Sequence, residues 1–512
     1  MLLKARLVLW VQLTLAILAP AAASADNWLF VPRLSLEETY TDNVLLAKRG
    51  GEGDFVTAIT PGMSVRGDSA RLHANIDYNL QQLLYGDKTE LDGINHQMQA
   101  NTATAIVKNW LFFDIDSAMS QQNTDNRGQI ARTNRNGNTN RRDVTSYEWA
   151  PRVTHKFGTL FDFDGRYYQQ QVSTSRNSPA VSSFSGGDSS ETGYEVEFRG
   201  GQRFGRFPLA AQSSSRTVEF RDGNRQVFSS NTGEASYIFN SRFRFTASGG
   251  VENNAFTSRT STNSGAIWNI GGTWTPSPRT TVSGKWGDRF FGKNFNVSAE
   301  HRARHLTFSL KYIEDIRTQN QFQRDLVLVP LVDAGGLPVF DPVTSGQIFS
   351  PLDGPSFSDD VFLEKNLSLG VNYTLGRSDL GLRFFDVDRS FQSTGADETM
   401  RGVSLNVQRS LRSRLSFAFG ATWRESEFAF DNSNGTFVSF YPSITYELGR
   451  HTTARIQYEF THNEGGGGSG LGGGGGLGGG FGGGLGGGAL GGSVTNRDYD
   501  ENAISANLIF HL

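Results

Sequence analysis

The stretch that decides the fold is ARLHANIDYNL, residues 70–80. Its apolar side chains occur at every second position, and polar or charged side chains fill the positions between them. Side chains alternate between two faces in a β-strand, whereas a helix repeats its faces about every 3.6 residues. The stretch therefore predicts a strand with one apolar and one polar face. The apolar face holds Leu72, Ala74, Ile76, Tyr78 and Leu80, and the polar face holds Arg71, His73, Asn75, Asp77 and Asn79.

The same alternation returns along the whole chain, for example in 111–116, 161–167, 306–312 and 415–424. It predicts an all-β fold. A soluble sandwich of two sheets also alternates, so the pattern alone leaves a sandwich and a membrane barrel open.

The connections between these strands separate the two folds, because short and long connections take turns. FGT at 157–159 and LGRH at 448–451 are short, whereas the loops 123–143, 174–190 and 319–358 are long. Tight turns on one side and long loops on the other are typical of outer-membrane barrels. We therefore expect a transmembrane antiparallel up-and-down β-barrel of about 22 strands, within a range of about 18 to 24.

The first 25 residues predict export through the inner membrane. Lys4 and Arg6 precede an apolar run, and small residues follow up to Ala25. This order is typical of a cleaved signal peptide, with cleavage before Asp26; a lone membrane anchor is the alternative. No later apolar run is long enough for a membrane helix, so a closed barrel is the membrane-spanning fold that the sequence allows from 26 to 512.

Composition excludes several classes of function. The chain has no cysteine, which rules out disulfides and cysteine-ligated zinc, and its net charge of −3 argues against a nucleic-acid partner. The eight histidines are scattered without the spacing of a metal site or a triad. We therefore identify no catalytic residues, no cofactor and no metal site, and a hydrolase is the least favoured reading.

A glycine-rich segment, 464–496, lies just before the end of the chain. With an even number of strands, it is expected to be the last external loop, where solvent satisfies its backbone. It is either a solvated spacer or a contact for a partner. The strand after it is expected to close the barrel, with a lipid face made of Ile504, Leu508, Phe510 and Leu512.

Near the start of the mature chain, LSLEETYTDNVLLA (34–47) and GDFVTAITPGMSVRGDSARLHANIDYNLQQLLY (53–85) resemble the outer-membrane protein family associated with PEP-CTERM/exosortase systems, which is related to porin-like barrels. The resemblance covers residues 28 to 120 best. It implies an outer-membrane barrel in bacteria that make exopolysaccharide, and it brings no catalytic residues. Two features depart from the family: the glycine-rich segment, and Leu512 where the last residue is usually aromatic.

The polar faces of the strands are expected to line a water-filled lumen. The first strand starts close to Asp26, which leaves no room for an N-terminal plug domain. A loop would then have to narrow the pore, and 319–358 is the longest one; an external cap is the alternative for it. The expected lumen-lining charges are Arg71, Asp77, Asp114, Asp116, Asp162, Asp164, Arg166, Arg383, Arg455 and Glu459.

One external loop, 123–143, is rich in arginine and is expected to attract anionic phosphates or polysaccharide; a loop merely made soluble by its charges is the alternative. The arginines are Arg127, Arg132, Arg135, Arg141 and Arg142. We expect a porin-like channel linked to exopolysaccharide export or envelope transport, with a non-conducting binding scaffold as the alternative. The expected partners are outer-membrane lipid and lipopolysaccharide, the barrel assembly machinery, and exopolysaccharide or its export apparatus.

Overall fold

The structure is a computed structural model and describes residues 28–123, 125–126, 128–137, 140–175, 188–259, 263–328, 354–428, 433–466 and 498–511. These residues form 22 strands in one sheet, and each strand pairs antiparallel with the next along the chain. The predicted signal peptide, most of the glycine-rich segment and Leu512 lie outside the described residues. Among the described residues, no helix is long and apolar enough to cross a membrane.

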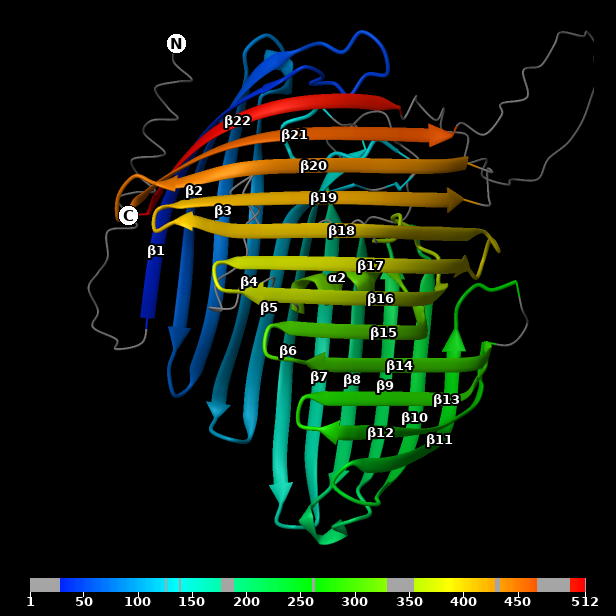
Figure 1. The fold of residues 1–512 in the computed structure, drawn as a ribbon. Coiled ribbons are helices and arrows are strands. Elements are labelled where there is room, and N and C mark those ends of the chain that lie inside the picture. The colour runs from blue at the N-terminus through cyan, green and yellow to red at the C-terminus, as the bar shows by residue number, and fades with distance from the viewer. Residues whose placement is uncertain are drawn as a thin grey trace, which may run out of the picture.

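The first half of the wall runs behind the second half in Figure 1. Its strands are β1 (Trp28–Thr41), β2 (Asp54–Asp68), β3 (Leu72–Tyr85), β4 (Gly93–Val107), β5 (Leu111–Asn123), β6 (Arg141–Phe157), β7 (Phe161–Thr174), β8 (Ser189–Gly200), β9 (Leu209–Phe220), β10 (Arg225–Ile238) and β11 (Phe243–Ala255). Two short 3-10 helices, η1 (Thr89–Leu91) and η2 (Gln202–Phe204), lie in its connections.

The second half of the wall completes the ring. Its strands are β12 (Gly265–Ser277), β13 (Thr280–Arg289), β14 (Gly292–Arg302), β15 (Leu306–Arg317), β16 (Phe362–Leu375), β17 (Ser378–Phe391), β18 (Asp397–Arg412), β19 (Leu415–Phe428), β20 (Ser433–Glu447), β21 (Thr452–Gly466) and β22 (Tyr499–His511). The described residues also form one α-helix, α2 (Gln319–Leu328), which follows β15 and lies between the front and back strands in Figure 1.

The barrel is closed by pairing between its first and last strands. Leu36 of β1 is the register partner of Leu508 of β22, and Tyr40 is the partner of Ile504. Closure leaves no unpaired sheet edge in the bilayer, where an unsatisfied backbone group is costly. The expected closed antiparallel barrel and its number of strands are therefore confirmed.

The two ends of the barrel differ as the sequence predicts. The connection after each even-numbered strand up to β20 is short, and we call that end the turn end. The connections after β1, β5, β7, β15 and β21 are long, and we call the opposite end the loop end.

The outer face is apolar and exposed, as a lipid-facing wall requires. Ile504 and Leu508 are 53% and 40% exposed, and Phe510 shares their face. Exposed aromatic side chains gather toward both ends, which is the arrangement of interfacial girdles. They include Trp110, Phe157, Phe207, Phe239 and Trp274 near the turn end and Tyr40, Phe55, Trp268, Trp286 and Phe295 near the loop end.

The opposite face of the strands is polar and points into the lumen. In β22, for example, Glu501, Ser505 and Asn507 are buried and alternate with the exposed residues of the outer face. Small apolar clusters interrupt this polar wall, such as Val144 and Val172 with Phe357 of the β15–β16 loop. Such a cluster shows that a loop covers the inner wall at that place.

Candidate functional site: the lumen and its inward-folded loops

The structure places nine of the ten predicted lumen charges on the inner face of their strands. They are Asp77, Asp114, Asp116, Asp162, Asp164, Arg166, Arg383, Arg455 and Glu459. Arg71 is different: it lies in the turn between β2 and β3, and its side chain is exposed. β3 begins one residue later, at Leu72. The alternation of apolar and polar residues in the sequence therefore extends beyond the strand into the bend that holds Arg71.

Several of these charges are neutralised by partners that the sequence analysis did not single out. Arg33 of β1 makes a two-point contact with Asp77, with Nη2–Oδ1 at 2.6 Å and Nη1–Oδ2 at 3.3 Å. Arg152 lies 3.2 Å from Asp114. The alternation of β1, in which Arg33 shares a face with Ser35, could have placed Arg33 in the lumen. The pairing could not be seen, because Arg33 and Asp77 come from different strands.

The loop between β5 and β6 folds into the lumen. Arg135 contacts Glu459 of β21 through Nη2 and Oε2, and Arg132 Nε lies 3.2 Å from the other oxygen of Glu459. Asn136 Nδ2 donates to Glu501 of β22 at 2.8 Å. Burial by itself would lower the pKa of Arg135, but the Glu459 and Glu501 carboxylates outweigh burial and raise it. Arg135 therefore stays charged inside the barrel.

This placement corrects the expected external basic loop for Arg132 and Arg135. Their side chains are only 11% and 5% exposed, so they are not displayed to phosphates outside the cell. The reason is that the inner wall offers two carboxylates, which give the guanidinium groups a closer partner than solvent does.

The remaining arginines of this loop have other places. Arg141 donates from Nη1 to the carbonyl of Thr133 at 2.7 Å and from Nη2 to the carbonyl of Asn134 at 2.9 Å. These two hydrogen bonds stabilise the turn of the loop at 133–134. Arg142 lies near the carbonyl of Ser175, at 3.5 Å. Arg127 lies outside the described residues.

The helix α2 is a second element inside the lumen. It contacts β4, β5 and β6 on the far side of the barrel from β15 and β16, which it connects. Gln323 and Gln122 of β5 exchange two hydrogen bonds, at 2.7 Å and 3.0 Å. Ser189 Oγ of β8 donates to Asn320 Oδ1 at 2.8 Å. The described part of the loop 319–358 therefore crosses the lumen.

The end of the same loop, residues 354–361, also lies against the inner wall. Asn224 Nδ2 donates to Asp359 at 3.2 Å. Asn126 of the β5–β6 loop donates from Nδ2 to the carbonyl of Gly354 at 2.8 Å, and its backbone N–H donates to the hydroxyl oxygen of Ser356 at 3.0 Å. The two inward loops therefore contact each other and restrict the lumen together.

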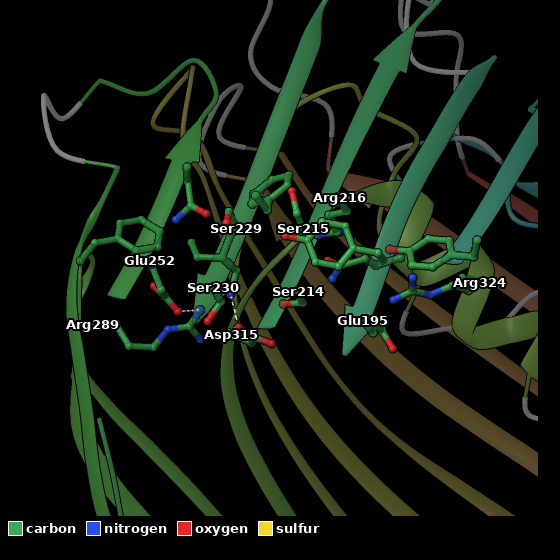
Figure 2. A pocket seen from close by; sticks show the side chains of 17 residues that line it. Glu195, Ser214, Ser215, Arg216, Ser229, Ser230, Glu252, Arg289, Asp315 and Arg324 are labelled. Atoms are coloured by element: carbon green, nitrogen blue, oxygen red, sulfur yellow. Dashed lines mark hydrogen bonds and ion pairs between the residues drawn. The ribbon is translucent and has the colours of Figure 1, made fainter. Parts of the chain in front are cut away.

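A cavity of about 190 Å³ remains beneath α2. Figure 2 shows Arg289 with Glu252 and Asp315 at one end of it and Arg324 at the other, with Arg216 between them. Arg289 lies 2.7 Å from both Glu252 and Asp315. None of these residues was predicted from the sequence, although the alternation of the strands places Arg216 and Arg289 on the polar face.

We found no group of three or more His, Asp or Glu side chains able to hold a metal ion among the described residues. The described lumen is lined by charged, amide and hydroxyl side chains.

Comparison with known proteins identifies the fold and nothing finer. No family model matches the sequence, and no curated protein matches it either. The chain is similar in structure to the F3-3 variant of the FrpB iron transporter from Neisseria meningitidis, with a TM-score of 0.53 and 10% identity over 95% of this chain and 82% of that one. It is also similar to a mutant of the ferric enterobactin receptor PfeA from Pseudomonas aeruginosa, with a TM-score of 0.50 and 9% identity over 94% and 80%. The fold is thus that of a large bacterial outer-membrane barrel.

Proposed function

We propose that this chain is an outer-membrane channel for hydrophilic solutes, whose width is set by its own inward-folded loops. The observation that carries the proposal is the polar inner wall, on which charged and amide side chains face the space that the barrel encloses. A barrel of this size with a polar interior admits water unless something fills it. Restriction then comes from the β5–β6 loop and from α2, rather than from a separate plug domain.

The solute is proposed to be a saccharide of the cell envelope. The support for this part is the resemblance of residues 28 to 120 to barrels of exopolysaccharide-producing bacteria, together with the hydroxyl and amide groups of the lumen. Barrel similarity to iron transporters is compatible with solute passage but is too distant to name the solute.

One observation favours a second function, a non-conducting scaffold. The inward loops are fixed by buried contacts, such as Arg135 with Glu459 and Gln323 with Gln122, and this arrangement could close the barrel permanently. The barrel would then serve to display its outer loops to polysaccharide or protein partners.

Conductance in planar bilayers separates the two functions. Arg317 and Phe362 are register partners in the β15–β16 pair, so residues 319–358 can be replaced by a short turn without cutting a strand. The channel proposal predicts measurable ion current for the full chain and a clearly larger unitary current for this deletion. A deletion of 467–492, in a different loop, is the control. An electrically silent full chain that also stays silent after removal of 319–358 would favour the scaffold.

A further inference from the structure

The cavity beneath α2 contains a cation to which the described residues offer no ion-pair partner. Arg216 of β9 faces the lumen, and in the part of the chain that the structure describes it makes no ion pair and no hydrogen bond with its side chain. Its Nη1 is buried and unsatisfied. A buried guanidinium nitrogen without an acceptor is costly, so its presence in a cavity points to a ligand.

The other two arginines of the cavity differ from Arg216 in having carboxylate partners, although Nε of Arg289 is also buried without an acceptor. Arg289 is held between Glu252 and Asp315, and Arg324 of α2 lies 3.4 Å from Glu191. Both are therefore neutralised by the protein. Among the described arginines that line the cavity, Arg216 is the one without an ion-pair partner, so its guanidinium is available to an anion from outside.

The guanidinium of Arg216 is also held in place. Its central carbon lies 4.0 Å from the centre of the Phe228 ring, a cation–π contact that fixes the plane of the group. A planar guanidinium in a fixed orientation can bind a carboxylate through two parallel hydrogen bonds. The geometry therefore suits a carboxylate better than a spherical ion.

The polar groups around Arg216 favour a ligand that carries hydroxyl groups as well as a negative charge. Ser214 and Ser230 line the cavity, and neither hydroxyl has a hydrogen-bond partner within the described residues. Glu195 lines it too, and its carboxylate is likewise without a described ion pair. Glu195 disfavours any anion in the cavity, but a sugar hydroxyl on the same ligand can donate to Glu195 and offset that repulsion, which a simple inorganic anion such as chloride cannot do.

We propose that this cavity is a binding site for a carboxylated sugar, a uronate, with the carboxylate on Arg216 and the ring hydroxyls on Ser214, Ser230 and Glu195. This inference deepens the proposed function and rests on it, because the cavity is reached through the lumen. Gln321 and Arg324 of α2 line the same cavity, so an occupied site is closed on one side by the inward loop.

Binding is tested on the full-length barrel in detergent by calorimetry, with D-glucuronate as the probe and D-glucose and acetate as comparisons. We expect glucuronate to bind more tightly than either. Arg216→Gln should weaken glucuronate by about 10- to 100-fold, the effect of losing a charge-assisted contact. Arg244→Gln, at an exposed lumen position of β11, is the control and should bind normally.

Three results would overturn the site: equal affinity of Arg216→Gln and the unchanged protein, glucose binding as tightly as glucuronate, or acetate binding as tightly as glucuronate. If Arg216→Gln does not fold, Arg216→Lys takes its place, since it keeps the charge but loses the planar pair of donors and should still bind more weakly. Different results test the channel proposal and the binding site. A barrel that binds glucuronate without conducting ions contradicts only the channel proposal, and a conducting barrel that does not bind glucuronate contradicts only the binding site.

Discussion

Arg135 and Glu459, which are 324 positions apart in the sequence, contact each other inside the barrel. Arg132 shares the same carboxylate, so one glutamate of β21 holds two arginines of the β5–β6 loop. All three side chains are almost fully buried. Removing one member of a buried ion pair weakens the compensation of the charge that stays, which makes this contact a sensitive anchor of the loop.

Glu459→Gln should release the β5–β6 loop from the wall. Both arginines would stay buried and lose the Glu459 carboxylate, and Arg135 would keep only Glu501, 3.9 Å away, at a cost of about 3–5 kcal/mol. We expect larger or noisier ion currents in bilayers and faster cleavage by trypsin after Arg132 or Arg135. Glu219→Gln, at an ion pair with Arg225 that is exposed on both sides, is the matched control and should behave normally. Unchanged currents and cleavage in Glu459→Gln would show that the loop is held by other contacts.

Gln122 and Gln323 should be energetically coupled, because each amide donates to the other. In a double-mutant cycle with alanine, the double variant should cost less than the sum of the single variants, with a coupling of about 1 kcal/mol. The measurement is the equilibrium between the restricted and open current levels. Gln212→Ala, at an exposed lumen position of β9, is the control. Additive effects of the two variants would mean that α2 does not dock on β5 through this pair.

Leu508 and Ile509 should differ in how strongly a positive charge at each position destabilises the barrel. Leu508 faces outward beside Leu36, whereas Ile509 belongs to the inner face beside Ser35. Leu508→Arg should destabilise the folded barrel in lipid vesicles by up to about 2–4 kcal/mol, and Ile509→Arg by clearly less. Urea titration of the reconstituted protein measures both. A larger loss for Ile509→Arg would reverse the assignment of the faces.

Asp360 should make the barrel less stable as pH rises. It lies in the loop before β16, where its carboxylate accepts hydrogen bonds from the Ser393 hydroxyl at 2.6 Å and the Ser393 backbone N–H at 3.1 Å. Burial raises the pKa of Asp360, and the hydrogen bonds from Ser393 offset burial only in part. A pKa raised by folding means that this group contributes its stability below its unfolded pKa of about 4 and loses it as pH rises through the folded pKa.

Asp360→Asn should therefore be at least as stable as the unchanged protein at neutral pH and should flatten the pH dependence above about pH 4. Urea midpoints between acidic and neutral pH measure this. Asp87→Asn, an exposed carboxylate in the β3–β4 connection, is the control. An unaltered pH profile in Asp360→Asn would mean that the carboxylate titrates as in the unfolded chain.

Much of the lumen could be predicted from the sequence, because strand alternation assigns faces residue by residue. It placed Asp77, Asp116 and Glu459 on the inner wall correctly. It failed for Arg71, since alternation does not show where a strand ends and a turn begins. Alternation also could not show that Arg33 lies opposite Asp77, because the partner of a charge depends on the register between strands.

The sequence by itself determined the wall of this protein: the strands, their approximate number, the closure of the ring and the face that side chains within the strands take. These features follow from a local period of two and from the demand of the bilayer that every backbone group be paired. Only the tertiary structure decided what occupies the lumen inside that wall. The inward course of the β5–β6 loop and of α2, and the isolation of Arg216 beneath them, depend on contacts between residues far apart in the chain, which no local pattern records.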